Sequence, residues 1–145
     1  MRPTVRDASM EDAEGLRPLL AQLGYPVSTE TLAARLAALL RSDRDAVLVA
    51  EETGTLLGVL ALHWGEMLHL AGPVARIGTL VVEEGARSRG IGGLLLREAE
   101  ALAQGQGCTL IELTSGRDRH MTHAFYEAHG YAWSSLRLHK ALGVG

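Results

Sequence analysis

The feature that most constrains the fold is a strand pattern that leads into a helix pattern through a turn rich in glycine and arginine. Residues 75–83 (ARIGTLVVE) favour a strand, because aliphatic and β-branched residues dominate them. Residues 85–93 (GARSRGIGG) form the turn, and apolar residues at helical spacing continue to Gly105. The segment therefore predicts a sheet strand connected directly to a helix.

Similar patterns run along the whole chain. We expect further strands at residues 3–7, 46–51, 55–64, 108–114 and 131–140. We expect helices after Ser9, after Ser28 or Thr29, and at residues 119–129. The resulting order, β-α-α-β-β-β-α-β-α-β, predicts a mixed α/β (α+β) fold with helices on the faces of one sheet. It excludes a helical bundle and a β-sandwich.

Composition sets further limits. A length of 145 residues suits a single domain, residues 1–145, that needs no metal or disulfide staple. One cysteine excludes an internal disulfide framework, and residues 1–7 lack the apolar region of a secretory signal, so we expect a cytoplasmic protein. No apolar stretch approaches the roughly 20 residues of a membrane span. A net charge of −3 argues against general nucleic-acid binding.

The turn has the chemistry of an anion site. The first N–H groups of a helix lack partners within it, and the helix dipole is positive there. Glycines at 90, 92 and 93 let an anion approach the backbone, while Arg87 and Arg89 add positive charge. We interpret the turn as a cradle for a pyrophosphate. A helix start that is merely rich in glycine remains the structural alternative.

Two common nucleotide-binding motifs differ from this turn. A Walker A loop needs G-x-x-x-x-G-K-S/T, and the turn contains no lysine. A dinucleotide fingerprint needs a third glycine where Leu95 stands, and the glycines follow the strand too late. A Walker A site is excluded, and a nucleotide enzyme is the weaker alternative.

Two motifs together resemble the GNAT superfamily of acetyl-CoA-dependent N-acetyltransferases. Residues 87–92 (RSRGIG) match the family pattern Q/R-x-x-G-x-G/A, and residues 124–131 (AFYEAHGY) resemble its F-Y-E-x-x-G-F/Y segment. Their order and the intervening helix and strand also fit the family. The resemblance implies a mostly antiparallel twisted sheet with a splayed strand pair, between residues 75–83 and 108–114, that receives acetyl-CoA.

The resemblance also implies which residues contact acetyl-CoA. The backbone of the strand would pair with the pantetheine arm, and the turn would surround the pyrophosphate. Arg119 stands where many relatives have an asparagine that bonds the arm. The expected contact residues are Leu80, Val81, Val82, Arg87, Ser88, Arg89, Gly90, Ile91, Gly92, Gly93, Arg119 and Phe125.

By the same resemblance, Tyr126 is the expected catalytic acid, which protonates the coenzyme A sulfur. A phenol has an ordinary pKa of about 10, so it is protonated at neutral pH and can donate to a thiolate. A core tyrosine with a satisfied hydroxyl is the structural alternative. The expected reaction is direct attack of a primary amine, of a small molecule or a peptide, on the thioester in a ternary complex.

The general base is not assigned by these motifs. Many relatives carry a glutamate on the strand before the turn, but in this chain Arg76 and Gly78 stand at the corresponding positions. A water held by Thr79 or by a backbone carbonyl is one alternative, and an amine of modest pKa needs no dedicated base. The side-chain candidates are His63, Glu66, Glu83 and Glu112.

The remaining expectations concern metals and partners. His120, His123 and His129 have no second ligand motif beside them, so we expect no metal site. The expected partners are acetyl-CoA and the amine acceptor, with a possible homodimer and no membrane or nucleic acid. Because the strand lacks the usual carboxylate, an acyl-CoA-binding regulatory or interaction protein without turnover is the alternative function.

Overall fold

A computed structural model of the chain describes residues 2–114, 122–134 and 138–143. In chain order, these residues form β1 (Thr4–Asp7), a 3-10 turn η1 (Met10–Asp12), α1 (Ala13–Gln22), α2 (Thr29–Arg41), β2 (Asp45–Glu52), β3 (Thr55–Gly65), β4 (Val74–Val82), a second 3-10 turn η2 (Glu84–Ala86), α3 (Ile91–Gly105), β5 (Leu110–Leu113) and α4 (His123–Ala128).

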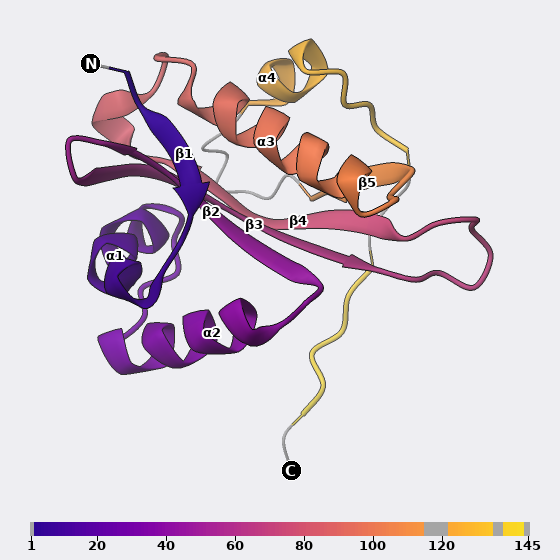
Figure 1. Cartoon of the computed structure of the whole chain (residues 1–145), viewed down its shortest axis with the longest axis horizontal. Helices are drawn as coiled ribbons and strands as arrows, with labels where there is room; N and C mark the ends of the chain where they lie inside the picture. The colour runs from indigo at the N-terminus through magenta and orange to yellow at the C-terminus, as the bar shows by residue number, and fades with distance from the viewer. Residues whose placement is uncertain (1, 115–121, 135–137, 144–145) are drawn as a thin grey trace.

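The strands form one sheet in the order β1-β2-β3-β4-β5. Pairing is antiparallel from β1 to β4, whereas β5 pairs with β4 in parallel. Helices α1 and α2 lie on one face of the sheet, and α3 and α4 lie on the other (Figure 1). The mixed, mostly antiparallel sheet with flanking helices is confirmed.

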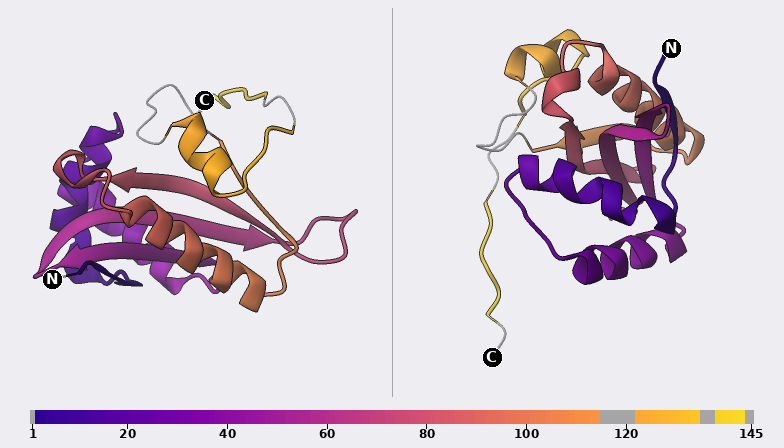
Figure 2. Two further views of the ribbon diagram at one scale, coloured as in Figure 1. Left: turned by 90° about the horizontal axis from the view of Figure 1, so that it is seen from above. Right: turned by 90° about the vertical axis from the view of Figure 1, so that its left-hand side faces the viewer.

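Each face of the sheet has its own hydrophobic core. Successive side chains of a strand point to opposite faces. Leu48 and Leu60 accordingly pack beneath α3, while Val49 and Val59 pack against α1 and α2. Figure 2 shows the helical layers on the two sides of the sheet. Because β2, β3 and β4 are covered on both faces, their sequences read as nearly continuous apolar runs.

Local caps explain where several helices begin. The Ser28 hydroxyl accepts a hydrogen bond from the Thr31 N–H at 3.1 Å, and the Thr122 hydroxyl accepts one from the Phe125 N–H at 3.1 Å. These bonds satisfy N–H groups that the first helical turn leaves without partners. Helix α4 therefore begins at His123, later than the expected residue 119; residues 119–121 lie outside the described part.

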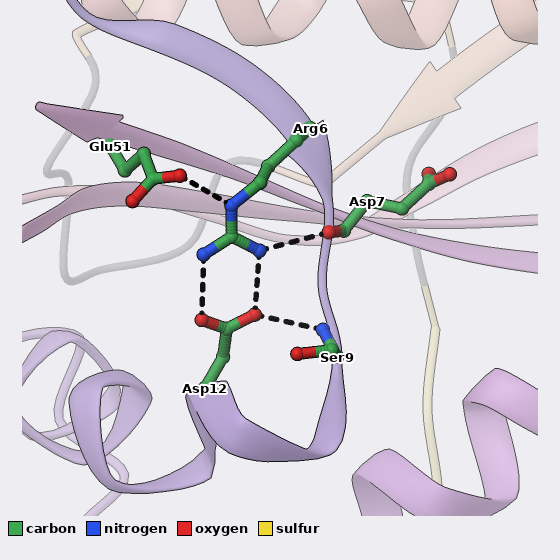
Figure 3. A network of polar contacts seen from close by, with 5 residues as sticks. All are labelled: Arg6, Asp7, Ser9, Asp12 and Glu51. Carbon is green, nitrogen blue, oxygen red and sulfur yellow. Dashed lines mark hydrogen bonds and ion pairs between the residues drawn. The ribbon is translucent and has the colours of Figure 1, made fainter. Parts of the chain in front are cut away.

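A network of charges attaches the start of α1 to the sheet (Figure 3). The guanidinium of Arg6 on β1 binds both carboxylate oxygens of Asp12 at 2.9 Å and binds Glu51 Oε1 on β2 at 2.6 Å. Asp12 also accepts the Ser9 N–H at 2.8 Å. The network thus fixes the η1 turn, and with it the entry to α1, against β1 and β2.

The expected strand at 131–140 was wrong for its described residues. Residues 131–134 and 138–140 have no strand structure. The Tyr131 N–H donates to the Tyr126 carbonyl at 3.0 Å, and the Tyr131 hydroxyl donates to Glu100 on α3 at 2.7 Å. These bonds direct the start of the segment onto α3 instead of onto the edge of β5. No helix in the described ranges is long and apolar enough to cross a membrane.

Candidate active site

The site begins where β4 and β5 stop pairing. Their last paired residues are Ile77 and Leu113, yet β4 continues to Val82. Gly78 is an extra residue in the pairing of β4 with β3, and such a bulge bends a strand. A Cβ added at Gly78 would meet nothing within 4 Å. Residues 78–82 therefore have no strand partner on the β5 side among the described residues, and we call this stretch the unpaired edge.

Side chains hold the unpaired edge in place from both faces. Leu80 and Val82 are 8% and 2% exposed and pack in the α3 core, while Val81 is fully buried in the core under α1 and α2. Because the side chains of Leu80, Val81 and Val82 pack in the two cores, these residues present their main chain to a ligand. This arrangement suits the expected pairing with an extended, amide-containing arm.

The turn after β4 has a run of backbone N–H groups without a described acceptor. Ser88 and Gly90 have left-handed backbone conformations, with φ of 72° and 80°. The first helical bond of α3 runs from the Leu94 N–H to the Gly90 carbonyl at 3.1 Å. Within the described ranges, the N–H groups of residues 88–93 have no hydrogen-bond acceptor. Unpaired N–H groups at such a turn form an anion-binding concavity.

The arginines of the turn have specific partners. Arg87 Nε donates to the Val82 carbonyl at 3.3 Å, so this side chain folds back over the end of β4. Arg89 pairs with Glu52 on β2 at 2.7 Å and holds the pKa of that carboxyl below its usual value. The sequence indicated only that Arg89 adds positive charge to the turn, and the structure places that charge in an ion pair at the edge of the turn.

Two further turn residues have packing roles that the sequence did not reveal. Ile91 is 1% exposed and belongs to the α3 core. A Cβ added at Gly93 would lie 2.9 Å from His129 Nε2, which is closer than real Cβ contacts. Glycine at 93 therefore allows α4 to approach α3. The sequence around Gly93 does not indicate this packing role, because His129 lies at the end of another helix, α4.

Tyr126 lies on the α3 side of the sheet. Its ring packs against the α3 core, and burial raises its pKa to about 12. Phe125 and Tyr131 are its aromatic neighbours, with ring centroids 5.3 and 6.0 Å away. No described residue forms a hydrogen bond with the Tyr126 hydroxyl, whereas the Tyr131 hydroxyl is bonded to Glu100. The Tyr126 phenol is therefore protonated at neutral pH and has no hydrogen-bond partner among the described residues.

Two of the candidate bases, His63 and Glu112, lie in one row across the sheet. Register aligns Asp45 on β2, His63 on β3, Arg76 on β4 and Glu112 on β5, and we call these four residues the charged row. His63 Nδ1 lies 3.0 Å from Asp45 Oδ1, and Arg76 Nη1 donates to Glu112 Oε1 at 3.0 Å. His63 and Glu112 therefore already have charged partners. The sequence alone did not reveal the row because it depends on strand register.

The charged row lies on the face opposite Tyr126. The neighbours of Arg76 and of Glu112 along their strands pack in the α3 core, so Arg76 and Glu112 point to the α1 and α2 face. Of the other candidates, Glu66 is 4.0 Å from Arg44 and Glu83 leads into the turn.

Two expectations concern residues at or beyond the limits of the described part. Arg119 and His120 lie outside it, so the structure places neither. Phe125 is partly buried beside Tyr126, and its carbonyl is 2.9 Å from His129 Nδ1. No group of three or more His, Cys, Asp or Glu side chains in the described ranges is arranged to hold a metal ion.

Comparisons with known proteins agree on one family. The profile of the acetyltransferase (GNAT) family matches residues 10–131. An aminoalkylphosphonate N-acetyltransferase of Salmonella typhimurium is 32% identical over 95% of this chain and 90% of its own. A putative acetyltransferase from Agrobacterium tumefaciens is 29% identical, with a TM-score of 0.85 over 96% of this chain and 99% of that one. An aminoglycoside N-acetyltransferase, AAC(6')-Iy, solved with CoA, has a TM-score of 0.84 at 17% identity over 97% and 95% of the two chains.

Proposed function

The chain belongs to the GNAT family and is an N-acetyltransferase, and from this premise we propose that it moves acetyl from acetyl-CoA to a primary amine in a ternary complex. The observation that carries this proposal is the continuity of the unpaired edge with the turn. β4 runs beyond β5 over residues 78–82 and leads to six N–H groups, at residues 88–93, that lack a described acceptor. One extended ligand with a diphosphate can pair with the edge of β4 and also accept hydrogen bonds from the N–H groups of the turn.

The residues present fit acetyl-CoA. The backbone of Leu80, Val81 and Val82 would pair with the pantetheine arm, as a strand pairs with a sheet edge. The N–H groups from Ser88 to Gly93 would bind the pyrophosphate. Arg87 and Arg89 line this turn, and the Glu52 partner of Arg89 keeps its guanidinium at the turn. A fold neighbour solved with CoA supports this assignment.

Tyr126 supplies the proton for the leaving thiolate in this proposal. When the neutral amine attacks the carbonyl carbon, a C–N bond forms and the C–S bond breaks, with the electron pair going to sulfur. Tyr126 O–H then protonates sulfur, and the amine nitrogen loses a proton that restores the phenol through solvent. Because burial raises the pKa of Tyr126 to about 12, the phenol stays protonated at physiological pH.

The acceptor approaches from the α1 and α2 face. That face carries the charged row, and Arg76 of the row lies two residues before the unpaired edge. The ammonium proton leaves to water on this side, since His63 and Glu112 already have charged partners there. Because a relative over nearly the whole chain is named an aminoalkylphosphonate N-acetyltransferase, aminoalkylphosphonates lead the proposed acceptors.

We also propose a cytoplasmic homodimer. A single, partly buried cysteine suits a reducing compartment. Trp133, Leu138 and Leu142 are exposed large apolar side chains, a feature that supports contact with a second copy. Sedimentation analysis of the purified chain tests the dimer, because a monomer at micromolar concentration would contradict it.

The decisive experiment measures thiol release from acetyl-CoA with a panel of amines. Release above the acceptor-free rate, with the N-acetyl product identified by mass, supports the transferase. CoA binding without any acceptor-dependent release would instead favour the alternative, an acyl-CoA-binding regulatory protein. Failure to bind CoA would refute the whole assignment of the unpaired edge and the turn.

A further inference from the structure

We propose that Arg76 binds an acidic group of the acceptor, so that this enzyme selects small zwitterionic amines. The inference rests on the acetyltransferase function proposed above and names the residue that chooses its acceptor. It follows from the position of Arg76, from the contacts of its guanidinium and from the charges around it.

Arg76 bridges β4 and β5 at the point where they separate. Its Nη1 donates to Glu112 Oε1 at 3.0 Å, and its Nη2 donates to Thr114 Oγ1 at 2.8 Å. Thr114 directly follows the last residue of β5, and Gly78, where the unpaired edge begins, is two residues beyond Arg76. The guanidinium is thus held at the start of the unpaired edge, on the face from which the acceptor approaches.

The Arg76 guanidinium has N–H donors that its described contacts do not use. It carries five N–H donors in a planar fork that matches carboxylate, phosphonate and phosphate oxygens. The contacts of Arg76 with Glu112 and Thr114 use two of these donors. Its side chain is 37% exposed, which leaves an incoming anion a path to the rest. A charge-assisted contact of this kind is stronger than one between neutral groups.

The neighbouring charges favour a zwitterion over a simple anion. Glu112 lies beside Arg76 with its side chain 48% exposed, so a positive and a negative group open together to the ligand. On the other flank, His63 is paired with Asp45 at 3.0 Å, and a protonated imidazole would be balanced by that carboxylate. An acceptor that arrives with an ammonium and an acidic group a few bonds apart complements the Arg76–Glu112 pair, and its ammonium loses a proton to water before the neutral amine attacks.

The ion pair can yield to a ligand because it is partly exposed. Exposed ion pairs contribute little to stability, so rotating Glu112 away costs the fold little. The contact from Arg76 to Thr114 can persist during this exchange and keep the guanidinium in place. Arg76 therefore combines a fixed position with a replaceable partner, as a recognition residue requires.

The test compares acceptors that differ in the acidic group. We would measure kcat and KM for 2-aminoethylphosphonate, β-alanine and propylamine with the wild type, Arg76→Gln, Arg76→Lys and a matched control, Arg44→Gln. Arg44 is also paired with a glutamate, Glu66, at 4.0 Å, and its replacement makes the same change in charge. The wild type should prefer at least one acidic acceptor over propylamine by about tenfold or more in kcat/KM.

Arg76→Gln should remove that preference by raising KM for the acidic acceptor, with propylamine within about twofold of wild type. Arg76→Lys should restore part of the preference, and Arg44→Gln should keep all of it. Acetyl-CoA affinity and the melting temperature of Arg76→Gln should stay near the wild-type values. Equal losses for charged and neutral acceptors would show a merely structural role and overturn the inference.

A binding measurement separates this inference from the proposed function. With CoA present, calorimetry should detect ethylphosphonate binding to the wild type and a loss of about tenfold or more in Arg76→Gln. Equal affinity for both proteins overturns the inference even if acetyl transfer is active. If instead no amine is acetylated, the transferase proposal fails. The calorimetric comparison of ethylphosphonate binding still tests whether Arg76 binds an acidic group.

Discussion

Replacing Asp12 by asparagine should destabilise the fold by about 2 kcal/mol. The Asp12 carboxylate lies between the Arg6 guanidinium, which donates two bonds of 2.9 Å, and the Ser9 N–H at 2.8 Å, and the residue is only 8% exposed. Asparagine keeps the shape of the side chain but removes its charge. Its NH₂ group must also face a donor, either the Arg6 guanidinium or the Ser9 N–H, where the carboxylate accepted a hydrogen bond.

The magnitude follows from the partial burial of the network. An exposed ion pair contributes about 0–1 kcal/mol, while breaking a buried one costs about 3–5 kcal/mol. The Arg6 side chain is 37% exposed and keeps its 2.6 Å contact with Glu51, so the cost falls between these limits. With an unfolding entropy of about 2.1 cal/mol/K per residue, a loss of about 2 kcal/mol lowers the melting temperature by about 7 °C.

Urea unfolding followed by circular dichroism measures this loss. Glu14→Gln is the matched control, because Glu14 is exposed and accepts one hydrogen bond, from the Thr29 hydroxyl at 2.7 Å. Its effect should stay below about 0.5 kcal/mol. A comparably small loss in Asp12→Asn would refute the reasoning that the network fixes the start of α1.

The pH dependence gives a second check. The Arg6 guanidinium lowers the pKa of Asp12 from its ordinary 3.8 in the folded state. A carboxyl with a depressed folded pKa stabilises the fold above its unfolded pKa and loses this contribution as the pH falls through the folded value. The advantage of the wild type over Asp12→Asn should thus be constant near neutrality and should shrink below about pH 3.8. An advantage that persists at low pH would contradict the assignment.

Three further predictions concern the proposed active site. Tyr126→Phe should lower kcat by about 100-fold with little change in acetyl-CoA affinity; equal losses would argue against a proton donor. Gly90→Val should weaken CoA binding about tenfold or more in calorimetry. Gly107→Val is the control, because Gly107 has a similar φ of 84° and equally open surroundings at the far end of α3. It should introduce the same backbone strain but leave CoA binding unchanged. Gly93→Ala should destabilise the fold by about 1 kcal/mol because the new Cβ meets His129. In the His129→Ala background the same substitution should lose this penalty, and a double-mutant cycle measures the difference.

The sequence predicted the parts of this fold that local rules decide. The strand expected at 75–83 is β4 (Val74–Val82), and the helix expected after the turn is α3 (Ile91–Gly105). Glycine at 90 permitted the left-handed backbone that the structure has there, whereas Gly92 and Gly93 lie inside α3. Such features depend on residues a few positions apart, so their signal is present in a short stretch of chain.

The sequence did not predict features that depend on distant segments. The strand expected at 131–140 was wrong for its described residues because Tyr131 bonds to Glu100 on α3. The close approach at Gly93 depends on His129, and the ion pair of Arg89 depends on Glu52 on β2. In each case, a side chain from elsewhere in the chain decides the outcome.

The sequence alone thus determined a strand, a glycine-rich turn and a helix in one continuous run, because backbone preferences are local. Only the tertiary structure decided that β5 leaves β4 after Ile77 and that Arg76 meets Glu112 there. Strand register and the bulge at Gly78 set both, and register is fixed by burying two cores at once on opposite faces of the sheet.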